Sequence, residues 1–164
     1  MRLIVVTASR HGATGEIGEA IARRLRDRGV DARTREASET NGMDRYDAVV
    51  LGSAVYMGRW LEAARSFAAA HERELAERPV WLFSSGPIAG KPDVAPADAE
   101  ELAERIGARA HRVFEGRLDK KSLGLAERAI AAVVHSPEGD FRDWAEVLAF
   151  ADEIAHELAP VALA

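Results

Sequence analysis

Residues 3–14, LIVVTASRHGAT, join a short apolar run to a small polar loop, directly before a helical pattern that begins near Gly15. A buried strand that enters a helix through such a loop aims backbone N–H groups and the positive end of the helix dipole at one point. We therefore expect an anion such as phosphate to bind there. The loop is neither the long P-loop nor the three-glycine dinucleotide fingerprint. An ordinary turn whose Ser and Thr residues cap the helix is the alternative that this stretch leaves open.

Length and composition bound the class of protein. The chain of 164 residues is long enough for one domain with a single core, which we place at residues 1–160. It contains no cysteine, which excludes disulfides, thiolate metal sites and cysteine nucleophiles, and its histidines lack metal-ligand spacing. The formal net charge of −5 argues against nucleic acid as a partner. Because no apolar run approaches the ~20 residues of a membrane span, we expect a cytoplasmic protein without a transmembrane segment.

Apolar periodicity predicts strands that alternate with helices. Runs at 3–6, 48–51 and 80–83 are typical of buried strands, the alternation over 30–34 is typical of a strand near an edge, and 110–118 is a fifth strand. Helical spacing recurs over 17–25, 61–75, 99–106 and 144–158. This order predicts an α/β fold, a doubly wound five-stranded parallel sheet with helices on both faces. The stripe expected to be buried on the last helix consists of Trp144, Val147, Leu148, Ala151, Ile154, Ala155 and Leu158.

Three loops of the predicted sheet share one composition. Ligands of such folds bind beyond the carboxyl ends of the strands, where the strand order reverses. The loops after the first, third and fourth strands, at 9–14, 52–60 and 84–92, are small, polar and rich in glycine. In the second loop, Tyr56 can offer its ring to a planar heterocycle, and Trp60 is a rival for that role. Together the loops predict a phosphate cradle and two walls for a flat ring, as a nucleotide-like cofactor needs.

In order and spacing, these loops resemble those of the flavodoxin-like family, which binds FMN in a sheet of strand order 2-1-3-4-5. The resemblance assigns to the FMN phosphate Ser9, Arg10, His11, Gly12, Ala13 and Thr14. It assigns to the flavin ring Ser53, Ala54, Val55, Tyr56, Met57 and Gly58, with Ser85, Gly86 and Pro87 at the other edge. The peptide between Met57 and Gly58 is the expected position of a backbone carbonyl near the flavin N5.

Within that family, the chain is similar to the menaquinone-dependent protoporphyrinogen oxidases and related flavodoxin domains. Residues 9–14, 46–58, 83–92 and 143–155 carry the likeness. It implies an FMN-dependent oxidoreductase that acts on a porphyrin-like or other small aromatic substrate, or on a quinone. A flavodoxin-type electron carrier that docks on redox partner proteins is the alternative. A binding domain that has lost its flavin is a third interpretation.

Charged residues and one variable segment bear on these alternatives. Arg10, Arg59 and Lys91 lie near the predicted ring, where they either attract an anionic substrate or form a solvated rim. A carrier is expected to surround its flavin with acidic groups instead. Residues 119–140, a variable insertion before the last helix, contain no aromatic residue and few basic ones, whereas the oxidases carry a long basic and aromatic insertion there. For this segment we favour packing in the core or in a homodimer over contact with a membrane.

Overall fold

The computed structural model describes residues 1–86, 95–118, 124–125 and 139–160. Pro87, Lys91 and most of the segment 119–140 lie outside these residues. In chain order the elements are β1 (Arg2–Ala8), α1 (Ala13–Asp27), β2 (Asp31–Glu36), the 3₁₀ turn η1 (Ala37–Glu39), β3 (Ala48–Tyr56), β4 (Arg59–Trp60), α2 (Glu62–Ala70), α3 (Glu72–Ala76), β5 (Val80–Ser85), α4 (Ala97–Ile106), β6 (Ala110–Phe114), β7 (Arg117–Leu118), β8 (Gly139–Asp140) and α6 (Trp144–Leu158).

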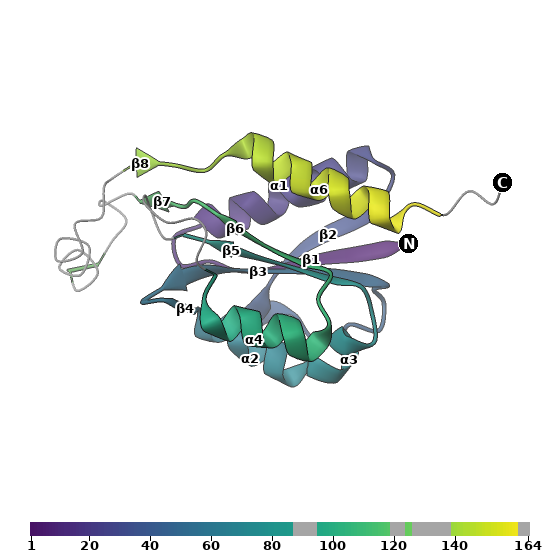
Figure 1. The fold of residues 1–164 in the computed structure, drawn as a ribbon, viewed down its shortest axis with the longest axis horizontal. Helices are drawn as coiled ribbons and strands as arrows, with labels where there is room; N and C mark the ends of the chain where they lie inside the picture. Colours follow the sequence, from purple (N-terminus) through teal and green to yellow (C-terminus); the bar gives the residue numbers. More distant parts are fainter. Residues whose placement is uncertain (87–94, 119–123, 126–138, 161–164) are drawn as a thin grey trace.

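The central sheet has the order β2-β1-β3-β5-β6, with parallel pairing at every step. This confirms the predicted doubly wound sheet, its strand order and the edge position of the second strand. Helices α1 and α6 cover one face, and α2, α3 and α4 cover the other (Figure 1). The short strand β4 pairs antiparallel with the end of β3, and β7 and β8 form a separate antiparallel pair.

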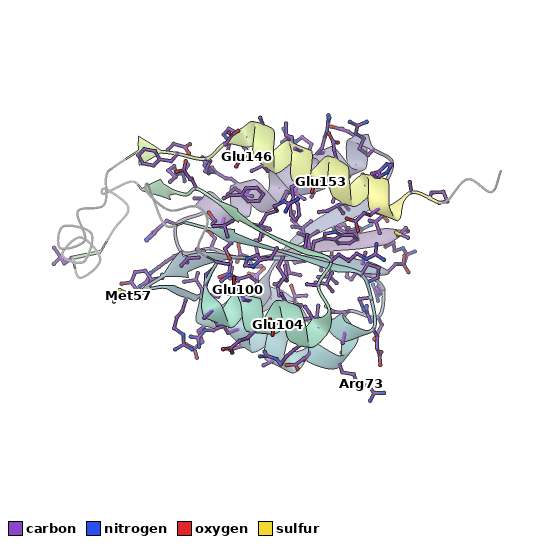
Figure 2. The ribbon with its side chains drawn as sticks, viewed as in Figure 1. Met57, Arg73, Glu100, Glu104, Glu146 and Glu153 are labelled. Carbon is purple, nitrogen blue, oxygen red and sulfur yellow. The ribbon has the colours of Figure 1, made fainter. Side chains whose placement is uncertain are left out.

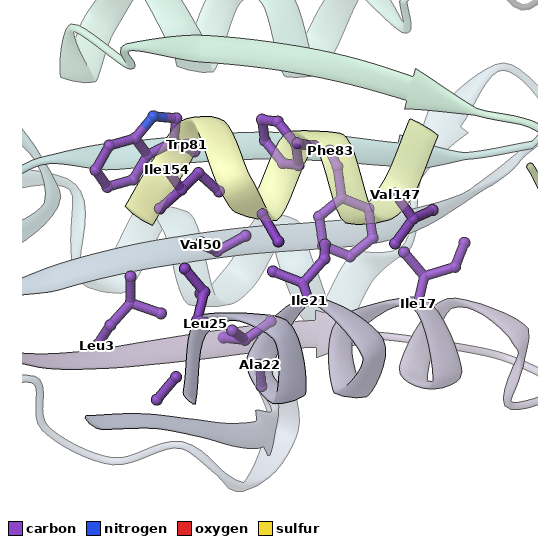
Figure 3. Packing of buried hydrophobic residues seen from close by; sticks show 14 of the residues in the cluster. Leu3, Ile17, Ile21, Ala22, Leu25, Val50, Trp81, Phe83, Val147 and Ile154 are labelled. Atoms are coloured by element: carbon purple, nitrogen blue, oxygen red, sulfur yellow. The ribbon is translucent and has the colours of Figure 1, made fainter. Parts of the chain in front are cut away.

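Two apolar clusters fill the spaces between the sheet and its helices. Alternate residues of a strand point to opposite faces, so β1 contributes Leu3 and Val5 to one cluster and Ile4 and Val6 to the other. Figure 3 shows the first cluster, in which Ile17 and Ile21 of α1 approach the sheet beside side chains from α6. Because both faces are covered, the central strands are apolar throughout, as expected for a parallel sheet.

Four local expectations differ from the structure. The strand expected over 110–118 ends at Phe114 as β6, and Arg117–Leu118 form the separate strand β7. The third and fourth strands extend through Tyr56 and Ser85, because small residues of the predicted loops continue the ladder between β3 and β5. The helix expected over 61–75 is divided at His71, whose φ of −116° is not helical. Trp144 and Leu148 are 39% and 38% exposed rather than part of the buried stripe. Trp144 is the first residue of α6, and the guanidinium of Arg142 covers its ring there.

Within the ranges that the structure describes, no helix is both long and apolar enough to cross a membrane.

Candidate functional site

The loop between β1 and α1 leaves the start of the helix open. Gly12 is the N-cap residue, with a positive φ of 86°, and it supplies no side-chain hydrogen bond to the helix. The hydroxyl residues of the loop therefore do not fill the N-cap position that the alternative interpretation required. A helix start without a side-chain cap presents its first N–H groups, together with the positive end of the dipole, to a ligand. Arg10, His11 and Gly12 are exposed, whereas Thr14 is buried.

Close packing fixes where this helix start lies. A Cβ placed on Gly18 would lie 2.5 Å from Cγ2 of Thr7 at the end of β1, so only glycine lets α1 approach the strand this closely. The first turn of α1 is thereby held over the carboxyl end of the sheet. The sequence pattern at 9–14 indicated the loop correctly but contained no sign of this contact.

The second predicted loop is a β-hairpin. Tyr56 pairs with Arg59 and Val55 pairs with Trp60, so Met57 and Gly58 form a two-residue turn. Both residues have positive φ values, 52° and 73°, as a type I′ turn requires. A residue other than glycine is strained in this conformation, and Met57 is also 69% exposed at the tip of the hairpin (Figure 2). The hairpin thus carries a solvent-facing, strained peptide at the position that the sequence analysis singled out.

Arg10 connects the first loop to the hairpin. Its guanidinium carbon lies 4.6 Å from the centroid of the Tyr56 ring, within the range of a cation–π contact. The half-buried Tyr56 therefore lies beside the loop at residues 9–14, with the guanidinium of Arg10 against its ring. Arg59, the other described cation of the predicted rim, is exposed on β4.

Trp60 is buried, so it does not compete with Tyr56 for a ligand at the surface. It is 2% exposed, and its Nε1 donates a hydrogen bond to Oγ of Ser84 at 2.8 Å. The same hydroxyl lies 2.8 Å from Nε2 of His111, and burial lowers the pKa of that imidazole. Sequence analysis missed this network, which joins residues 24 and 27 positions apart in the chain.

Ser53 has a structural role in the hairpin. Its buried hydroxyl donates to the carbonyl of Ala54 at 2.8 Å and accepts the N–H of Leu61 at 3.0 Å. The hydroxyl therefore ties the end of β3 to the start of α2. Contact of the flavin with Ser53, Ala54 or Val55 stays a prediction.

The third loop starts at Gly86, directly after β5. Its φ is 93°, and its N–H donates to the carbonyl of Phe114 at 2.9 Å. A Cβ on Gly86 would lie 3.8 Å from the carbonyl oxygen of Val55, so this turn passes close to the hairpin. Ser85 is buried, and Pro87 lies outside the described residues.

The register of the sheet brings the three loops together. Ala8 pairs with Ser53, and Ala54 pairs with Ser85, so β1, β3 and β5 end side by side. This is the edge at which a doubly wound sheet binds its ligand. The sequence analysis missed Arg142, which reaches the first turn of α1 from the segment before α6. No local pattern around Arg142 indicated that contact.

A second feature lies along the outer edge of β6. A hollow of about 810 Å³ is lined by Glu100 and Glu104 of α4 and by Glu146 and Glu153 of α6, on opposite sides of the sheet (Figure 2). One of these carboxylates, that of Glu153, forms an ion pair with Arg112 at 2.8 Å. Phe114 also lines the hollow, which therefore adjoins the third loop. Among the described residues, no group of three side chains could hold a metal ion.

Comparison with known proteins gives consistent results. Residues 4–144 match the family model described as Flavodoxin domain. The protoporphyrinogen IX dehydrogenase [quinone] of Escherichia coli strain K12 is 24% identical over an alignment of 173 positions, gaps included, which covers 95% of this chain and 96% of the relative.

Solved structures show the same fold. A flavodoxin from the domain Archaea aligns with a TM-score of 0.65 at 18% identity, over 96% of this chain and 98% of that protein. Oxidised flavodoxin 1 from Bacillus cereus aligns with a TM-score of 0.68 at 16% identity, over 97% of this chain and all of that protein (100%).

Proposed function

Because the chain belongs to the Flavodoxin domain family, we propose that it binds FMN at the carboxyl edge of its sheet and acts as an FMN-dependent oxidoreductase. The observation that carries this proposal is the meeting of the three loops. The open start of α1, the Tyr56 hairpin and the Gly86 turn end on adjacent strands. In the proposal, residues 9–14 hold the phosphate, residues 53–58 line one side of the ring, and residues 85–87 line the other edge.

The described residues fit such a ligand. The space around Gly12 is open, since a Cβ there would meet no atom within 4 Å, and the loop carries a cation in Arg10. An uncapped helix start beside a cation suits a phosphate group. The half-buried ring of Tyr56 offers an aromatic surface next to this cradle, which suits a flat heterocycle.

FMN, when bound, supplies transfer of hydride or single electrons, and the protein supplies position and electrostatics. Tyr56 would orient the ring, and the first turn of α1 with Arg10 would hold the phosphate. The strained turn at Met57 and Gly58 would present a backbone group beside the ring. Because Met57 is strained as it stands, this peptide is suited to changing its orientation.

A quinone or a porphyrin-like compound is the substrate class that we propose. The supporting observation is the full-length similarity to a protein named protoporphyrinogen IX dehydrogenase [quinone]. Arg10 lies in the first loop and Arg59 on β4 of the hairpin, and both exposed cations would favour an anionic substrate such as one that bears carboxylates.

An electron carrier is the second candidate function, and the hollow beside β6 favours it. Four glutamates line that hollow, which adjoins the Gly86 turn. An acidic surface next to a redox centre would attract the basic face of a partner protein. Such docking weakens steeply as salt is added, because exposed charges are screened.

The first experiment tests whether FMN binds. The purified protein should carry a flavin that denaturation releases as FMN, and FMN at about 100 times its Kd should raise the Tm by roughly 5–10 °C. A colourless protein whose Tm does not respond to FMN would leave the flavin-free binding domain as the remaining interpretation.

The second experiment separates enzyme from carrier. A soluble menaquinone analogue should reoxidise the reduced protein at a rate that depends little on salt if the protein is a quinone-linked enzyme. A carrier should instead react slowly with quinone and exchange electrons with a flavodoxin reductase at a rate that falls as salt is added. Reversal of charge at Glu100 and Glu104 should slow only the second reaction.

A further inference from the structure

Arg142 has a buried side chain whose partners come from two parts of the fold. Its side chain is only 4% exposed. The guanidinium donates to both carboxylate oxygens of Asp140, at 2.8 and 2.7 Å, and it also donates to the carboxylate of Glu16. A longer bond of 3.4 Å reaches the carbonyl of Ala13. The last two acceptors belong to the first turn of α1, so Arg142 joins the segment before α6 to that turn.

Two arginines donate to the same carboxylate oxygen of Glu16. Besides Arg142, Nη1 of Arg117 on β7 donates to its carboxylate at 3.1 Å. Strands β7 and β8 lie beyond the end of the sheet where α1 begins (Figure 1). A carboxylate in the first turn of a helix stabilises the helix but repels an anion at the same end. The two arginines on Glu16 offset that repulsion and hold the carboxylate in place.

We propose that Arg142 is a positioning residue that sets the orientation and charge of the first turn of α1 for phosphate binding. This inference rests on the proposed function of residues 9–14. Among the loop residues assigned to the phosphate, Arg142 contacts Ala13 through its backbone carbonyl, and it reaches the first turn of α1 a second time through Glu16. The pair of bonds to Asp140 fixes the plane of the guanidinium, and this in turn fixes the direction of its bond to α1.

Lysine cannot replace arginine in this arrangement. The ammonium group is a single point, whereas three acceptor groups surround the planar fork of Arg142 in different directions. Loss of the guanidinium would also leave Asp140 without the partner that lowers the pKa of its carboxyl to about 2. The first turn of α1 would then carry a less compensated Glu16 beside the predicted phosphate.

Arg24 provides a matched control. It lies in the last part of the same helix and donates two bonds of 2.8 Å to Asp152 of α6, so it also ties α1 to a neighbouring segment. Its position is remote from the start of α1. Arg24→Gln and Arg142→Gln therefore both remove a guanidinium group that ties α1 to a neighbouring segment. Only the second change affects the end of α1 that we assign to the phosphate.

The experiment compares the affinity of the full chain for FMN with its affinity for riboflavin, which lacks the phosphate. Arg142→Gln should weaken FMN binding about tenfold and leave riboflavin binding within about twofold. Arg142→Lys should fail to restore the preference for FMN, and Arg24→Gln should keep it. In the flavin-free protein, the amides of Glu16 and Ile17 should exchange faster with solvent in Arg142→Gln than in Arg24→Gln.

Each outcome decides one question. If the unchanged chain binds FMN no better than riboflavin, the proposed phosphate site is wrong, and the inference fails with it. If the unchanged chain prefers FMN and Arg142→Gln keeps that preference, only the role of Arg142 is wrong. Should Arg142→Gln fail to fold, Asp140→Asn releases the fork while keeping the arginine, and an unchanged preference in that variant equally overturns the inference.

Discussion

Replacement of Gly52 by alanine should destabilise the centre of the sheet. Gly52 lies on β3 between Thr7 of β1 and Phe83 of β5. The ring of Phe83 occupies the space above it, so a Cβ on Gly52 would lie 2.1, 2.2 and 2.5 Å from three ring atoms. Ordinary contact between carbon atoms needs about 3.5 Å. The ring would therefore have to move by more than about 1 Å.

The surroundings resist that movement. Phe83 is fully buried, its centroid lies 5.9 Å from that of Phe114, and Phe114 lies 5.8 Å from Phe150. Overpacking of a tight core costs about 1–3 kcal/mol, and three blocked ring atoms in a closed aromatic row place Gly52→Ala near the upper value. Gly15→Ala is the control, because the nearest atom to its Cβ would be 3.8 Å away. That change should stabilise α1 by up to about 1 kcal/mol.

Urea denaturation of the flavin-free protein measures the effect as a lower midpoint at unchanged slope. Phe83→Leu removes the blocking ring atoms, so adding Gly52→Ala to Phe83→Leu should cost less than about 1 kcal/mol further. Strict additivity of the two changes would refute the packing argument. So would a Gly52→Ala variant within about 0.5 kcal/mol of the unchanged chain.

Three further changes test other features. Met57→Asn should raise the free energy of unfolding, measured in urea, by about 0.5–1 kcal/mol, because asparagine tolerates the positive φ of this hairpin turn. A loss of stability would contradict the strain at Met57. Asp143→Ala should lower the free energy of unfolding by about 1 kcal/mol, seen as a lower Tm. Asp143 is the N-cap of α6, and its side chain accepts hydrogen bonds from the N–H groups of Ala145 and Glu146 at 2.9 and 3.3 Å. An unchanged Tm would show that this cap does not contribute to stability. Burial lowers the pKa of His111 below 6.5, so the unfolded chain takes up the proton first, and the free energy of unfolding should fall as the pH drops through about 6.5. His111→Gln should flatten that part of a pH series of urea titrations, and an unaltered profile would exclude His111 as its source.

Local sequence patterns predicted most of the fold because they agree with the tertiary structure. The apolar run at 3–6 indicates a strand that is buried on both faces, as the central β1 is. The alternation over 30–34 indicates a strand that is buried on one face, as the edge strand β2 is. The ends of β3 and β5 were placed too early, because Gly52 and Ser84 have the composition of a turn. Pairing with neighbouring strands overrides that preference.

The candidate site was less accessible to such reasoning. Residues 9–14 and Tyr56 could be found because loop composition and strand order together locate the edge of the sheet. The sequence alone could not exclude Trp60 as the aromatic residue that contacts the planar ring. Its hydrogen bond to Ser84, which lies 24 positions away in sequence, is visible only in the structure. The contact of Arg142 with Glu16 spans 126 positions, and no short-range periodicity encodes a separation of that size.

The pairing of β7 with β8 has a consequence for how this chain can vary. Arg117 lies opposite Asp140 and Leu118 opposite Gly139, so the two ends of the intervening segment are held side by side. The entropy of closing a loop between such fixed ends rises only with the logarithm of its length, by about 0.6 kcal/mol for each doubling. A change in the length of the segment between the two strands therefore costs little closure entropy, because the β7–β8 pair fixes its two ends.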